Sequence, residues 1–202
     1  MIKDLGLAGI YLFTLITTIF FGSLTLNREF ESRTYDQLSI RPVSSHIFIL
    51  GKFIGLFMAM ALNIIVLYLI YLIVILAKGG GFDALSLIQT LFLFEEITIV
   101  ISLNFLISTR FPHLGTITLG AIMVVLGHST ILFKTVGIGF TKFIGLLVYY
   151  LLPNLEKFNY RNSIVYGQHP GFENLLLAAF YALAYSAILL ILTTEIIKKR
   201  TR

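Results

Sequence analysis

Long apolar runs separated by short polar segments dominate the chain. A helix rises about 1.5 Å per residue and the hydrocarbon core of a bilayer is about 30 Å thick, so about 20 apolar residues cross it. Four runs meet this length, namely Leu5–Leu26, Phe53–Ala77, Leu114–Phe133 and Phe172–Thr194. A fifth, Leu85–Ser108, is equally long but holds two carboxylates near its middle. The pattern predicts an all-α bundle of about five membrane-spanning helices.

Glu95 and Glu96 are these two carboxylates. Each costs about 2–3 kcal/mol or more if it faces lipid, so we predict that they turn toward the bundle interior. One interpretation is that they line a substrate path or carry protons. The other is a hydrogen bond to a Ser, Thr or Asn side chain, such as Asn63 or Asn104, or a position in a wet space between helices. Adjacent helical positions point about 100° apart, so both carboxylates cannot face one cavity centrally.

The remaining apolar run, Phe143–Leu152, stops before Pro153 and is too short to cross a bilayer. It predicts a re-entrant or interfacial helix within an outer segment, residues 134–171. We expect residues 1–202 to form one transmembrane domain. The short connection between the first two spans, residues 27–52, is then its main cytoplasmic segment.

Composition supports a membrane protein. The chain is 57% hydrophobic and 12% charged, whereas soluble domains average about 25% charged residues. The formal net charge is +5, and the basic residues cluster between the apolar runs. This distribution is typical of residues that set the orientation of a protein in the membrane rather than of nucleic-acid binding. The chain has no cysteine, which excludes a disulfide, a thiolate metal site and a cysteine nucleophile.

The Lys and Arg residues indicate the orientation. With the N-terminus outside, the inner side holds Arg28, Arg33, Arg41, Lys52, Arg110, Lys198, Lys199, Arg200 and Arg202. The outer side holds Lys3, Lys78, Lys134, Lys142, Lys157 and Arg161. The excess predicts a multi-pass protein of the plasma or inner membrane with a cytoplasmic C-terminus.

The cytoplasmic segment has the pattern of a short amphipathic helix. Phe30, Thr34 and Leu38 recur at i, i+4 and i+8, and charged residues cover the other faces. Pro42 prevents the helix from continuing, and Ser44 or Ser45 can cap a new helix that leads into the second span. The segment is either a positive loop that only sets topology or a docking element for a soluble partner.

Its residues also resemble those of a known family. Three short runs are similar to the membrane subunit of bacterial type-2 ATP-binding-cassette (ABC) transporters. They are, in chain order, Arg28-Glu29-Phe30-Glu31-Ser32-Arg33-Thr34, Arg41-Pro42-Val43-Ser44 and Leu50-Gly51-Lys52. Leu152–Phe158 resembles the outer segment of one bacterial branch of these permeases. Family members usually carry six spans, so the resemblance implies that this chain lacks the first one.

The resemblance implies a non-catalytic permease of an exporter that works with an ABC ATPase in trans and a second permease subunit. It implies that the surface helix meets the ATPase through Arg28, Glu29, Glu31, Arg33, Thr34, Tyr35 and Asp36. The chain has no phosphate-binding loop of its own, because Phe53 follows Gly51-Lys52 and His46 stands where the first glycine belongs. ATP hydrolysis is therefore expected in the partner.

Two alternatives assign the chemistry to this chain. An ion-coupled carrier would use the carboxylates Glu95 and Glu96, and an intramembrane enzyme would pair one of them with His128 as acid or base. Both leave the charged segment between the first two spans unexplained. We expect no cofactor and no metal, because His46, His113, His128 and His169 lie in four different segments without the spacing of a helical metal pair.

Overall fold

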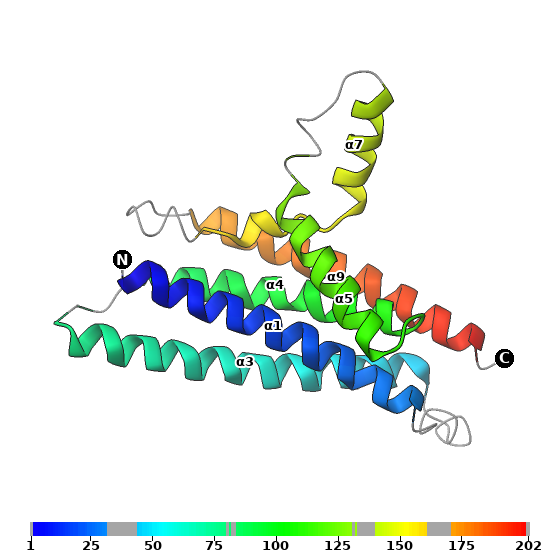
Figure 1. Cartoon of the computed structure of the whole chain (residues 1–202), viewed down its shortest axis with the longest axis horizontal. Coiled ribbons are helices and arrows are strands. Elements are labelled where there is room, and N and C mark those ends of the chain that lie inside the picture. The colour runs from blue at the N-terminus through cyan, green and yellow to red at the C-terminus, as the bar shows by residue number, and fades with distance from the viewer. Residues whose placement is uncertain are drawn as a thin grey trace.

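The computed structural model describes residues 2–31, 44–79, 81, 84–130, 132, 140–160 and 171–200. In these ranges all regular structure is helical, which confirms the predicted all-α fold. Four long helices run side by side (Figure 1), namely α1 (Ile2–Glu31), α3 (Ser45–Ala77), α4 (Ala84–Ser108) and α9 (Phe172–Arg200). Each contains a stretch that is long and apolar enough to cross a membrane.

Helix α5 (His113–His128) is shorter than the predicted fourth run. Its 16 residues span about 24 Å, less than the hydrocarbon core. Ser129 is its C-cap and donates its backbone N–H to the carbonyls of Val125 and Leu126, both at 3.1 Å. The rest of the predicted run lies partly outside the described residues, so its extent to Phe133 stays a prediction. Among the described residues, the bundle therefore has four helices long enough to cross a membrane and one shorter apolar helix.

Helix α4 is the centre of the bundle. It contacts α1, α3, α5 and α9, and its membrane-crossing stretch is 72% buried, against 28% in both α3 and α9. Ile97 and Ile101 of α4 pack toward α3, whereas Phe92 and Val100 belong to a second cluster with α5 and α9. Most polar side chains of α4, Glu96 among them, are therefore buried inside the bundle.

Of the two helices that flank the segment predicted to be cytoplasmic, one differs from the prediction at its end. Helix α1 continues unbroken through Glu31, so its last turn includes the residues that we expected to begin a separate surface helix. Ser44 caps α3 as predicted, accepting a hydrogen bond from the Ile47 amide at 3.4 Å. The 33 residues of α3 extend about 50 Å, so part of this helix must protrude beyond the hydrocarbon core.

A helical protrusion follows α5. Helix α7 (Phe140–Leu151) projects away from the four long helices (Figure 1), and a short 3-10 turn, η1 (Leu155–Phe158), returns the chain to the bundle. Leu155 and Phe158 are fully buried against the bundle. The short helix predicted before Pro153 is present, and its location at the membrane interface stays a prediction.

Candidate functional site

An ion pair joins the two helices that flank the segment predicted to be cytoplasmic. Lys52, two turns into α3, donates a hydrogen bond to the carboxylate of Glu29 in the last turn of α1. Both side chains are partly buried, with 34% and 19% exposed, and the Lys52 ammonium also lies 5.7 Å from the Phe48 ring centroid. The pair therefore links the end of α1 directly to the start of α3.

The remaining residues predicted to couple to an ATPase divide into two groups. Arg28 and Glu31 lie with Glu29 in the last turn of α1. Arg33, Thr34, Tyr35 and Asp36 lie outside the described residues, so their role as docking residues stays a prediction.

A polar cluster holds α1, α4 and α5 together near the same end of the bundle. The buried Asn27 amide donates to Ser108 of α4 at 3.4 Å and to Thr116 of α5 at 3.2 Å. The Ser23 hydroxyl lies 2.8 Å from Nδ1 of His113 and donates to the His113 carbonyl at 2.9 Å. Interhelical bonds of this kind contribute about 0.6–2 kcal/mol each in a membrane.

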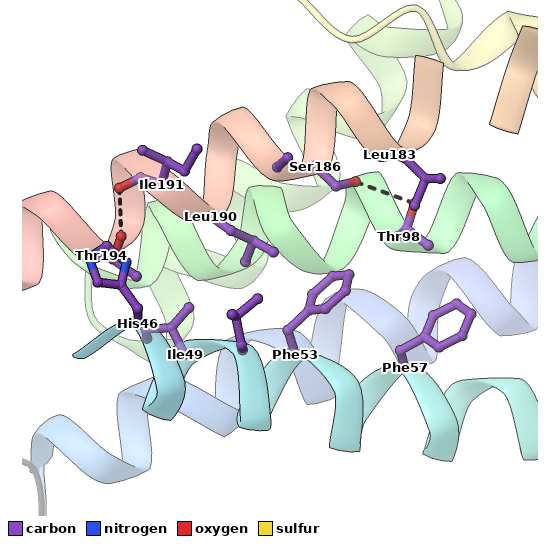
Figure 2. Close-up of a pocket in the computed structure, with 12 residues that line it drawn as sticks. His46, Ile49, Phe53, Phe57, Thr98, Leu183, Ser186, Leu190, Ile191 and Thr194 are labelled. Carbon is purple, nitrogen blue, oxygen red and sulfur yellow. Dashed lines mark hydrogen bonds between the residues drawn. The ribbon is translucent and has the colours of Figure 1, made fainter. Parts of the chain in front are cut away.

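An elongated cavity of about 380 Å³ lies between α3, α4 and α9. Figure 2 shows Ile49, Phe53 and Phe57 of α3 on one side and Leu183 and Leu190 of α9 on the other. The lining is almost entirely apolar. Its size falls within the range of small-molecule sites, about 300–1,000 Å³.

The cavity has a few polar groups along its length. His46 and Thr194 lie at one end, and Ser186 donates to the Thr98 hydroxyl at 3.3 Å farther along (Figure 2). An apolar wall with isolated polar groups suits a molecule with a long apolar part and a small polar part. The sequence did not single out this cavity, because its residues are ordinary apolar positions on helices far apart in the chain.

The two mid-span carboxylates have different environments. Glu96 is fully buried, in agreement with the prediction that the carboxylates face the bundle interior, whereas Glu95 is only partly buried. The partners of Glu96 are Tyr11 of α1 and His128 of α5, not Asn63 or Asn104. Asn104 instead donates to the Val100 carbonyl of its own helix at 2.8 Å.

Helices of this length and apolarity, packed around a buried α4, define a polytopic α-helical membrane protein. A family model described as ABC-2 family transporter protein matches residues 2–127. This stretch includes α1, α3, α4 and nearly all of α5 and covers more than half of the chain, so the chain belongs to that family. No curated protein and no solved structure shows a significant match to it. The chain is thus of the permease class of ABC transporters.

Proposed function

We propose that this chain is the permease subunit of an ATP-driven exporter and that it docks an ATPase subunit through the segment starting at Arg28. Membership of the ABC-2 family supports the permease role and an ATPase partner in general. The docking residues, the second permease subunit and the direction of transport are the parts that need a test.

The ion pair between Glu29 and Lys52 is the observation that best supports docking at this position. The segment from 32 to 43 connects the ends of α1 and α3, and the ion pair links these two ends directly. A force applied to the segment by an ATPase would therefore move α1 and α3 as a unit. Because α3 also forms one wall of the apolar cavity, this movement would change the cavity.

The apolar cavity supports an amphipathic cargo. Its wall on α9 continues into the exposed apolar face of that helix, where Leu183 and Ile191 are 65% and 56% exposed. A molecule dissolved in the membrane could enter there without crossing a polar surface. Uptake from the lipid phase followed by ATP-driven release outside is the transport direction that fits this geometry.

Charge reversal at the ion pair tests the docking mechanism. The tagged chain is co-expressed with the products of its neighbouring genes, purified, and assayed for co-purification of an ATPase and for ATP hydrolysis. We expect Glu29→Lys and Lys52→Glu each to reduce the ATP hydrolysis of the complex while the chain still inserts, because each places like charges together. The double exchange Glu29→Lys/Lys52→Glu should recover most of the activity.

Glu195→Lys is a matched control, since Glu195 pairs with Lys198 at 3.8 Å near the end of α9 and both are about half exposed. This variant should keep the parent activity. A chain that purifies without any ATPase would contradict the proposed function, and parental activity in both single reversals would contradict the role of the ion pair. Uptake of an amphipathic dye into inverted vesicles, measured with the same complex, tests the direction.

A further inference from the structure

A row of titratable side chains leads from the protein surface into the bundle. The exposed fraction of the side chain falls from 44% at Glu156 of η1 to 21% at His128 of α5 and to 0% at Glu96 of α4. Nδ1 of His128 lies 3.4 Å from Oε2 of Glu156, and Nε2 lies 2.9 Å from Oε1 of Glu96. The two ring nitrogens of one histidine therefore connect an exposed carboxylate with a fully buried one.

Tyr11 of α1 completes the inner end of this row. Its hydroxyl donates to Oε1 of Glu96 at 2.9 Å and lies 2.5 Å from Nε2 of His128. The other oxygen of Glu96, Oε2, is buried and has no hydrogen-bond partner. A carboxylate with one unsatisfied oxygen in an apolar interior is costly, and a bound proton removes most of that cost.

The same heavy-atom positions fit two arrangements of the proton. In the first, Glu96 is an acid that donates to Nε2, while Nδ1–H of a neutral His128 donates to Glu156. In the second, the proton has moved to Nε2, so that an imidazolium ion lies between two carboxylates. Neither arrangement requires a helix to move.

Other titratable groups on the elements packed against α4 have different partners. Tyr68 of α3 bonds to Ser86 at 3.0 Å, and Tyr185 of α9 donates to the Leu151 carbonyl at 2.7 Å. Lys157 of η1 lies 4.1 Å from the ring centroid of Tyr181. Glu95, the neighbour of Glu96 on α4, is partly buried, and the hydrogen bonds of the His128 ring run to Glu96, Glu156 and Tyr11.

A metal ion fits this arrangement poorly. Glu96 and Glu156 lie on opposite ring nitrogens of His128, so the three side chains do not converge on one point. Within the described residues, no group of three or more metal-ligating side chains surrounds a common centre. The ligand that the geometry suits is a proton.

We infer that Tyr11, Glu96, His128 and Glu156 form a proton-binding site inside the membrane that exchanges with the solution on the Glu156 side. On release, the O–H bond of Glu96 breaks and an N–H bond forms at Nε2 of His128. The N–H bond at Nδ1 breaks, the Glu156 carboxylate takes that proton, and water at the surface removes it. Loading reverses these steps, and Glu96 alternates between acid and carboxylate.

This site is independent of ATPase docking, because none of its residues lies at the ion pair between α1 and α3. Its members come from α1, α4, α5 and η1, so the charge on Glu96 acts directly on the packing of α1 and α5 against α4. A proton bound or lost here therefore changes the energy of one helix arrangement relative to another.

Infrared difference spectroscopy of the purified full-length chain tests the site without any transport assay. The protein carries ¹³C-labelled glutamate carboxyls and is compared between mildly acidic and mildly alkaline buffer. We expect the C=O stretching band of a protonated carboxyl that is shielded from water. This band should be lost in Glu96→Gln and kept in Glu95→Gln, which changes the neighbouring residue and serves as the control. A spectrum of Glu96→Gln identical to that of the parent, or loss of the signal in Glu95→Gln instead, would overturn the proposal.

The route is tested with the outer members of the row. After a rapid pH change, the Glu96 signal should respond more slowly in Glu156→Gln and His128→Gln than in the parent, because each removes a proton acceptor. A response of the Glu96 signal that is as fast in both variants as in the parent protein would overturn the proposed route. These variants also keep the proposal testable if Glu96→Gln loses its helical circular dichroism signal.

Discussion

Gly120 of α5 lies directly against Asn104 of α4. A Cβ atom at position 120 would be 2.5 Å from Oδ1 of Asn104 and 3.4 Å from Cγ2 of Ile19 on α1. Asn104 is fully buried and its amide is bonded to the Val100 carbonyl at 2.8 Å. Three helices thus meet at a position where only a glycine fits, as in other close contacts between membrane helices.

We predict that Gly120→Ala destabilises the bundle by about 1–3 kcal/mol, because the methyl group must displace a bonded buried amide. Gly55→Ala on α3 is the control, since a Cβ atom there meets nothing within 4 Å. Unfolding in a denaturing detergent, followed by circular dichroism, measures both variants. Equal stability of the two variants would refute the close contact between α4 and α5.

The polar cluster around Asn27 gives a second prediction. Asn27→Ala removes the interhelical bonds to Ser108 and Thr116 and should lower the unfolding free energy by about 1 kcal/mol or more. Thr25→Ala is the control, because the exposed Thr25 hydroxyl bonds only within its own helix, to Phe21 at 2.7 Å. The same unfolding assay applies, and the idea fails if Thr25→Ala costs as much as Asn27→Ala.

The apolar cavity gives a third prediction. Ala187 lines it from α9, so Ala187→Phe should fill part of the space and weaken the binding of an amphipathic fluorescent probe by about tenfold or more, because steric clashes of this kind cost 1–3 kcal/mol. Ala184→Phe places the same group on an exposed position of α9 that does not line the cavity. A titration of probe fluorescence compares the two. Unchanged binding in Ala187→Phe would exclude the cavity as the cargo site.

Much of the secondary structure was predictable from the sequence. The runs starting at Leu5, Phe53, Leu85 and Phe172 correspond to α1, α3, α4 and α9, and Ser44 caps α3 as expected. The ends of the apolar runs do not coincide with the ends of the helices. A helix can continue beyond its apolar run, and α1 accordingly extends past Leu26 to Glu31.

The sites were predicted only in part. The sequence indicated that Glu96 faces inward and that His128 was its possible acid–base partner, and the structure places the two 2.9 Å apart. Tyr11 and Glu156 were missed, and no local signal distinguished them from other aromatic or charged residues at helix positions. The apolar cavity was missed for the same reason.

The sequence by itself determined that the chain is helical and lies in a membrane, because both follow from the length of apolar runs and from backbone hydrogen bonds made within each helix. It also indicated the family, through the residues between Arg28 and Lys52. The tertiary structure alone decided which polar groups meet. Tyr11, Glu96 and His128 are up to 117 residues apart in the chain, and only the rotation and crossing of α1, α4 and α5 bring them together.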